Sequence, residues 1–339
     1  MVELDALEKR CLLRWTVGSN PTLSAIVWAI YPSLFKMKLK KLLFFVVVSI
    51  LALSLVLIKL ATGTIYVDGP LMQSIADQLS FGPRYVGSNG HQKVRQYIQK
   101  SLKSTDAAVF KQAWVDEETG MALENYLARF NPEARRRIII AAHYDTDPTA
   151  KKDKHRSSAP VPGASDGASA TAVLLQLAKT IKSADIDKDI GLDLVFLDAE
   201  NYDAGSFSDW HPKGSGYFAR NIGEFYAQLP ESALVVDMVC DKNLNFNQEK
   251  ASLQSANGTV SKVWQIGRAL DPKAFSGDQL VEIKDDHNQL ISAGIPSMVL
   301  IDLDYPYHDT TADSIDKCSE KSLVTTLELL KRYVQASAK

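Results

Sequence analysis

A run of apolar residues that ends in a histidine and a carboxylate constrains this chain more than any other stretch. Residues 138–145 read Ile-Ile-Ile-Ala-Ala-His-Tyr-Asp, a pattern typical of a buried central strand. His143 and Asp145 lie two residues apart, so their side chains project to the same side of an extended backbone. A metal-ligating histidine often donates its second ring N–H to such a carboxylate. The pair therefore suggests a metal ligand with Asp145 as its supporting partner.

Taken alone, a histidine after a strand is more often a hydrogen-bonded surface residue than a ligand. Later strand-like runs in this chain, however, also lead into acidic or histidine side chains, and a glycine- and serine-rich turn at 163–170 carries a further acid. Small residues in that turn let a ligand approach the backbone closely, although a helix N-cap is an alternative role for its acid. The residues concerned are Asp166, Glu200, Asp237 and His308.

Strand-like and helix-like runs alternate along most of the chain. This order predicts a doubly wound α/β fold with a mostly parallel central sheet and helices on both faces. In such folds ligands bind beyond the carboxyl ends of the strands, where the candidate side chains fall. Two histidines and several carboxylates without cysteine suit catalytic zinc or a similar divalent ion. Glu200 need not be a ligand, because a carboxylate beside the metal can act as a general base.

The net charge and the cysteine content of the chain exclude some binding partners and some metal-binding motifs. The 339 residues are 46% hydrophobic and carry a net charge of 38 − 40 = −2, with no basic block outside the N-terminal region. The main domain is therefore not expected to bind nucleic acid. The three cysteines form no CxxC pair, which excludes a zinc ribbon or a thioredoxin-type motif. Cys240 and Cys318 can pair if they lie outside the cytoplasm, and the sequence leaves this open.

The N-terminal region contains seventeen uncharged residues at 42–58, preceded by three lysines between 38 and 41. We expect a transmembrane signal anchor over residues 37–62, with the following domain on the extracytoplasmic side. No convincing cleavage site follows, and a buried core helix is disfavoured because the run is hydrophobic all round. Residues 1–36 have no domain-like pattern, and one hypothesis is that translation begins at Met37. The catalytic domain is expected over residues 65–339.

Taken in order, the candidate residues resemble a known family, the zinc aminopeptidases and glutaminyl-peptide cyclotransferases of metallopeptidase family M28. The resemblance covers roughly residues 70–335. The cyclotransferase branch is the more similar in the residues of its motifs and in their order along the chain. The stretches that carry the family resemblance are 143–145, 163–167, 196–200, 214–219, 236–239, 285–287 and 308–310. Those that favour the cyclotransferases are 87–91, 131–135 and 283–287.

The resemblance implies specific roles. In the dinuclear aminopeptidases Asp166 would bridge two zinc ions, with His143 and Asp237 completing one site and residue 201 and His308 the other. A cyclotransferase would hold a single zinc on Asp166, residue 201 and His308. Both branches imply that Glu200 is the proton-shuttling acid. In a cyclotransferase, Asp237 and Asp285 would join Glu200 in a hydrogen-bond network.

Two positions depart from the family pattern. Residue 201 is asparagine, where the family has Glu or Asp, and a neutral amide is a poorer zinc ligand than a carboxylate. Tyr307 stands where animal cyclotransferases carry tryptophan, although Tyr305 and Trp210 keep the expected substrate pocket aromatic.

The sequence thus predicts a membrane-anchored enzyme with one or two zinc ions that acts on the N-termini of peptides or proteins. Cyclisation of N-terminal glutamine is the leading interpretation. The alternatives are an aminopeptidase, in which water activated by the metal attacks the first peptide bond, and a binding module that lost its metal through Asn201.

Overall fold

The structure, a computed structural model, describes residues 68–202, 211–277 and 279–337, together with residues 41, 44 and 47–49. The predicted signal anchor therefore lies largely outside the described residues, as do residues 1–36 and Trp210. Within the described part of the chain, no helix is both long enough and apolar enough to cross a bilayer. The chain divides into two compact units, Met1–Gly63 and Thr64–Lys339, and the second contains the fold that follows.

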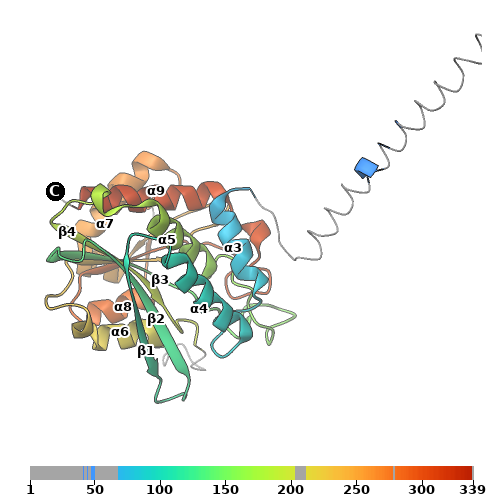
Figure 1. The fold of residues 1–339 in the computed structure, drawn as a ribbon, viewed down its shortest axis with the longest axis horizontal. Helices are drawn as coiled ribbons and strands as arrows, with labels where there is room; N and C mark the ends of the chain where they lie inside the picture. The colour runs from blue at the N-terminus through green and yellow to red at the C-terminus, as the bar shows by residue number, and fades with distance from the viewer. Residues whose placement is uncertain are drawn as a thin grey trace, which may run out of the picture. The chain divides into compact units, whose positions relative to one another are not determined.

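A six-stranded sheet in the order β1-β2-β4-β3-β5-β8 runs through the centre of this unit (Figure 1). The four strands β4, β3, β5 and β8 are parallel, whereas β1 and β2 form an antiparallel hairpin at one side. The strands are β1 (Ala108–Val115), β2 (Ala122–Phe130), β3 (Arg136–His143), β4 (Ile190–Leu197), β5 (Ser232–Asp237) and β8 (Ser297–Ile301), with a separate pair β6 (Gln248–Glu249) and β7 (Leu280–Val281).

Strand β3 lies between β4 and β5, and all its residues after Arg136 are buried. Its side chains alternate between two apolar clusters: Ile138 and Ile140 pack into one, Ile139 and Ala141 into the other. Both faces of the strand are therefore covered, which explains why its sequence is apolar without a polar alternation. The expected central strand is confirmed.

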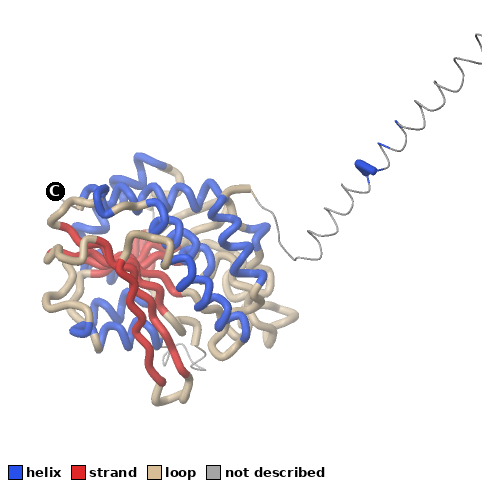
Figure 2. Tube along the Cα trace, in the orientation of Figure 1, coloured by secondary structure: helices blue, strands red, loops and turns tan. Residues whose placement is uncertain are grey.

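Helices cover both faces of the sheet, as Figure 2 shows with the strands in red between the blue helices. The larger cluster contains side chains of α3 (Pro70–Ser80), α4 (Asn89–Leu102), α5 (Ala168–Thr180), α7 (Lys250–Leu270) and α9 (Glu320–Ala336). The smaller cluster contains those of α6 (Lys213–Arg220) and α8 (Asp286–Ser292). Short 3-10 turns are η1 (Ser183–Asp185), η3 (Ile222–Glu224) and η4 (Ile315–Lys317).

A disulfide joins Cys240 to Cys318, whose Cα atoms lie 4.6 Å apart. Cys240 follows β5 closely, and Cys318 lies two residues before the start of α9. The backbone N–H of Ser319 also donates to the Cys240 carbonyl at 2.8 Å. The loop after β5 and the segment between β8 and α9 are therefore tied together, and the pairing that the sequence left open is formed.

Candidate metal centre and active site

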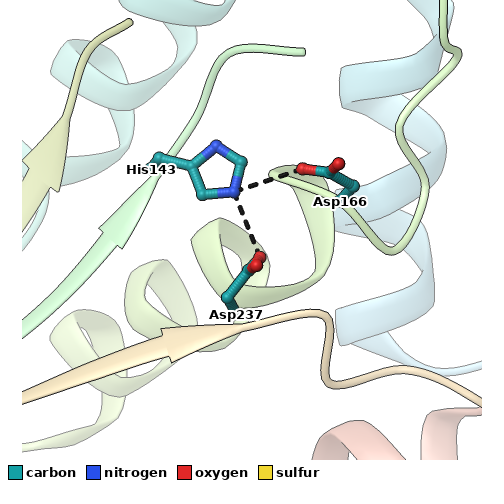
Figure 3. Close-up of side chains that lie close together, drawn as sticks. All are labelled: His143, Asp166 and Asp237. Carbon is teal, nitrogen blue, oxygen red and sulfur yellow. Dashed lines mark hydrogen bonds and ion pairs between the residues drawn. The ribbon is translucent and has the colours of Figure 1, made fainter. Parts of the chain in front are cut away.

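Three side chains from separate parts of the sequence converge at the carboxyl end of the central strands (Figure 3). His143 ends β3, Asp237 ends the neighbouring strand β5, and Asp166 precedes α5. His143 Nε2 lies 3.1 Å from Asp237 Oδ1 and 3.3 Å from Asp166 Oδ1, and all three residues are buried. The strand order brings these residues together, because the carboxyl ends of adjacent parallel strands meet at one edge of the sheet.

The backbone around these residues adopts conformations that most residues avoid. Gly167 has φ +87°, and a Cβ added there would meet the Asp145 carbonyl oxygen at 2.3 Å, so only glycine fits. Ala199, Met238 and Asp309 also have positive φ, at 54°, 46° and 57°. Each is adjacent in sequence to a predicted site residue: Glu200, Asp237 and His308 respectively. Strained backbone of this kind concentrates at functional sites and is held by the surrounding structure.

Asp145 lies behind the metal-ligand group and holds the end of β4. Its Oδ1 is 3.6 Å from His143 Nδ1, an ion-pair distance that is too long for a hydrogen bond. Its two carboxylate oxygens accept the backbone N–H groups of Glu200, at 3.0 Å, and of Asn201, at 2.9 Å. Asp145 therefore supports the site mainly by fixing the backbone of Glu200 and Asn201.

Asp313, which the sequence analysis missed, holds the turn that carries Asp166. Its buried carboxylate accepts the backbone N–H groups of Ser165 at 2.8 Å and Asp166 at 3.1 Å, and the hydroxyl of Tyr305 at 2.6 Å. Burial raises the pKa of Asp313 to about 6. The segment around Asp313 has neither helical nor strand periodicity, so no local sequence pattern indicated that Asp313 belongs to the site.

A second group shares Asp166 and contains His308 and Asp309. His308 Nε2 lies 3.8 Å from Asp166 Oδ2 and 3.2 Å from Asp309 Oδ1. Asn201 directs its side-chain Nδ2 toward Asp166 Oδ1 at 3.0 Å. All residues assigned to a metal by the resemblance thus lie around Asp166, but at position 201 an N–H donor faces the shared carboxylate.

Acidic side chains surround Glu200, which is partly buried at the edge of the site. Burial and the charges of Asp286 and Asp285 raise the pKa of Glu200 well above its ordinary range, although His143 lowers it. Burial and neighbouring acids likewise raise the pKa of Asp285 to about 6 and that of Asp286 to about 8. Asp285 was expected from the resemblance. Asp286, at the start of α8, was not, because consecutive residues give no signal of which one faces the site.

The group of His143, Asp166 and Asp237 fits a metal ion. Burial lowers the pKa of His143, but the carboxylates of Asp237 and Glu200 outweigh that effect and hold the pKa well above its usual value. Its Nδ1 has no hydrogen-bond partner among the described residues. Buried carboxylates that converge on one imidazole nitrogen stabilise a positive charge there, which either a proton on the imidazole or a bound metal ion supplies. Three nitrogen and oxygen ligands with an open position are the arrangement of catalytic zinc.

The predicted aromatic pocket residues take different positions. Tyr305 is 2% exposed and donates its hydroxyl to Asp313. Tyr307 is half-buried, with its ring 5.5 Å from that of Tyr305 and 4.8 Å from Lys317 Nζ. Trp210 lies outside the described residues. A role of these rings in substrate binding stays a prediction. In this structure the Tyr305 hydroxyl contacts the same Asp313 carboxylate that holds the backbone of Asp166.

Comparisons with known proteins identify relatives of this chain. The sequence profile described as "Peptidase family M28" matches residues 125–334. A glutaminyl-peptide cyclotransferase of Drosophila melanogaster is 26% identical over 279 residues, which cover 73% of this chain and 76% of that protein.

Solved structures of two related proteins have similar folds. A zinc-dependent exopeptidase of Parabacteroides distasonis superposes with a TM-score of 0.72 at 27% identity, covering 78% of this chain and 96% of the other. A glutaminyl cyclase of Tannerella forsythia superposes with a TM-score of 0.70 at 27% identity, covering 78% and 97%. The chain is therefore similar to enzymes of both branches.

Proposed function

Because the chain belongs to peptidase family M28, a family of zinc-dependent enzymes, we propose that it cyclises N-terminal glutamine of peptides or proteins and releases ammonia. The similarity to a glutaminyl-peptide cyclotransferase and to a bacterial glutaminyl cyclase supports this choice of reaction. The observation that carries it is the position of Asp285 and Asp286, which lie close enough to Glu200 to raise its pKa. Both branches use Glu200, whereas the resemblance places Asp285 beside it in a cyclotransferase.

Zinc would be held by His143, Asp166 and Asp237, whose ligand atoms lie closest together. A zinc ion held there would supply Lewis acidity that makes the carbon of the substrate carboxamide more electrophilic. The buried positions of Asp166 and Asp237 exclude water from that side of the site. Asp313 orients the turn that carries Asp166, and Asp145 orients the backbone of Glu200, each by accepting backbone N–H groups.

Glu200 would move the proton that cyclisation requires. The α-amino nitrogen of the substrate forms a bond to the γ-carboxamide carbon, and the bond from that carbon to the amide nitrogen breaks. One proton must leave the attacking amine and another must reach the departing nitrogen, which becomes ammonia. A carboxyl whose pKa is raised toward neutrality can both accept and deliver this proton. Burial, together with the charges of Asp286 and Asp285, raises the pKa of Glu200 well above its ordinary range.

Aminopeptidase activity is the second candidate, and one observation favours it. The group that the aminopeptidase branch uses for its first metal, His143 with Asp166 and Asp237, is intact and compact in this chain. In that reaction water attacks the first peptide bond, Glu200 takes a proton from the water, and the new amino terminus receives it. A binding module without catalysis is the third candidate, because Asn201 removes one anionic ligand.

The reaction is tested by incubating the zinc-loaded chain with a Gln-initiated peptide and, separately, with an aminoacyl chromogenic substrate. Cyclisation is detected by mass spectrometry as a loss of ammonia without chain shortening. We expect cyclisation of the first substrate and no cleavage of the second. Cleavage without cyclisation would favour the aminopeptidase. Failure with both substrates in a folded, zinc-loaded chain would favour the binding module.

The N-terminal segment 37–62 would anchor the enzyme in a membrane, with the catalytic domain on the extracytoplasmic side. The lysines at 38, 40 and 41 support this orientation, and the Cys240–Cys318 disulfide suits an oxidising compartment. Release of the full chain from membranes by alkaline carbonate would contradict the anchor. A native N-terminal peptide that includes residues before Met37 would rule out translation from Met37.

A further inference from the structure

The polar loop at 147–165, between β3 and α5, packs against the segment that carries His308. The backbone N–H of Lys152 donates to the Asp309 carbonyl at 3.0 Å. The backbone N–H of Thr311 donates to Asp153 at 3.2 Å, and Arg156 donates to the Thr311 hydroxyl at 2.5 Å. Contacts at three successive points fix the loop beside the second metal-ligand group.

Lys152 reaches His308 itself. Its Nζ lies 3.0 Å from His308 Nδ1 and 3.0 Å from Asp309 Oδ2. An ammonium has only donors, so His308 Nδ1 must be the acceptor in this contact. The proton of a neutral imidazole then resides on Nε2, the nitrogen that faces Asp309 Oδ1 at 3.2 Å and Asp166 Oδ2 at 3.8 Å.

This arrangement conflicts with zinc on His308. A ligating Nε2 must offer a lone pair, which places the imidazole proton on Nδ1. That proton would point at the Lys152 ammonium. Both groups are hydrogen-bond donors, so the contact would be repulsive. The ammonium also already neutralises Asp309, and Asn201 supplies an N–H where the family has an anionic ligand. Three features of this chain therefore oppose a metal ion in the second group.

The first group shows no such conflict. The ion pairs of His143 within the described part of the chain are with carboxylates, namely Asp145, Asp166 and Asp237. The Nε2 lone pair is therefore available to a cation that replaces the proton. The two groups share Asp166 but differ in the charge that faces their histidine.

We infer that Lys152 closes the His308 group to zinc, so that the chain holds a single zinc ion through His143, Asp166 and Asp237. This differs from both arrangements that the family resemblance implies, a pair of ions and a single ion on His308. The inference goes beyond the proposed function because it assigns to Lys152 the exclusion of zinc from the His308 group, and this exclusion applies whichever reaction the enzyme catalyses.

Zinc stoichiometry tests the role of Lys152. The full chain is stripped with a chelator, titrated with zinc, and examined by native mass spectrometry together with metal analysis. We expect one tightly bound ion in the wild type. The double variant Lys152→Met with Asn201→Glu should bind a second ion roughly tenfold or more tightly than Asn201→Glu alone does, because only the double variant lacks the ammonium beside His308. Lys154→Met, an exposed lysine of the same loop, is the matched control and should behave as the wild type.

Two tight ions of similar affinity in the wild type would overturn the inference, as would a second ion that Asn201→Glu and the double variant bind equally well. Single ligand variants then locate the ion. His308→Ala should keep the wild-type zinc, whereas Asp237→Asn, and His143→Ala if it folds by circular dichroism, should lose it. Loss of zinc in His308→Ala with retention in Asp237→Asn would place the ion in the other group and refute the proposal. A chain that holds one ion but acts on neither substrate would leave this inference intact and remove the proposed function.

Discussion

The carboxylate of Asp313 accepts the backbone N–H of Asp166 at 3.1 Å, so a buried acid positions the residue that both metal-ligand groups share. The two residues lie 147 positions apart in sequence. The site therefore depends on the segment between β8 and α9 for its shape as well as for His308.

Asp313→Ala is expected to destabilise the domain strongly. The change leaves two backbone N–H groups and the Tyr305 hydroxyl without their buried acceptor, and each unsatisfied group costs about 1–3 kcal/mol. Tyr305→Phe removes only one hydroxyl from the same cluster and should cost about 1 kcal/mol. Urea unfolding measures both. Equal costs for the two variants would show that the backbone contacts of Asp313 contribute little.

Glu200→Gln should reduce turnover by roughly 10²–10⁴-fold, because the group that transfers the proton is lost. Zinc content should remain unchanged, since Glu200 is absent from the ligand groups of the described residues. Activity assays and metal analysis of the same preparation check both statements. Glu282→Gln, at an exposed acid paired with Lys250, is the control. Loss of zinc in Glu200→Gln would identify Glu200 as a ligand.

Gly167→Ala should disrupt the metal centre. A Cβ at this position would meet the Asp145 carbonyl oxygen at 2.3 Å and His143 Cε1 at 3.2 Å, and φ is +87°. Backbone strain alone costs about 1–3 kcal/mol, and relief of the clash must displace the loop that carries Asp166. We expect weaker zinc binding in a chelator competition. Gly223→Ala, where no atom lies within 4 Å of an added Cβ, should bind zinc as the wild type does.

Replacement of both Cys240 and Cys318 by serine should lower the free energy of unfolding by about 2–4 kcal/mol, because the bridge closes a long loop in the unfolded chain. Denaturant unfolding of the oxidised protein and the double variant measures this difference. Cys11→Ser serves as the control for loss of a cysteine outside the bridge. A variant as stable as the oxidised protein would mean that the bridge does not restrict the unfolded state.

Stability at low pH should depend on Glu249, which caps α7. Its carboxylate accepts the N–H groups of Ala251 at 2.9 Å and Ser252 at 2.6 Å, and contacts His287 at 3.2 Å. Although burial opposes the shift, these partners lower the pKa of Glu249 from 4.5 to about 2. A lowered pKa contributes stability that is present above pH 4.5 and is lost as pH falls toward 2.

Glu249→Ala should therefore cost about 0.5–2 kcal/mol near neutral pH, as lost N-caps do, and should reduce the acid dependence between pH 4.5 and 2. Thermal unfolding over that range compares the variant with the wild type. A parallel pH dependence in both proteins would exclude Glu249 as a source of the acid sensitivity.

Much of the fold was predictable because its signals are local. The run at 138–142 is apolar and begins with three β-branched isoleucines, and it lies within the central strand, whose two faces are both covered. The acids and histidines that follow strand-like runs fall at the carboxyl ends of parallel strands, because an alternating order of strands and helices implies that geometry. That reasoning placed five candidates in one region, and the family resemblance then grouped His143 with Asp166 and Asp237. The structure brings these three residues together. The five candidates are His143, Asp166, Glu200, Asp237 and His308.

The sequence by itself determined the type of fold and the kinds of side chain available at the strand ends, because periodicity, β-propensity and residue chemistry act over a few neighbouring positions. Only the tertiary structure decided which groups face one another. The contact of Lys152 with His308, the support of Asp166 by Asp313 and the approach of Asp286 to Glu200 join residues between 86 and 156 positions apart. The order of strands in the sheet and the path of the loops determine which of these distant residues come into contact. No local sequence pattern indicates either of them.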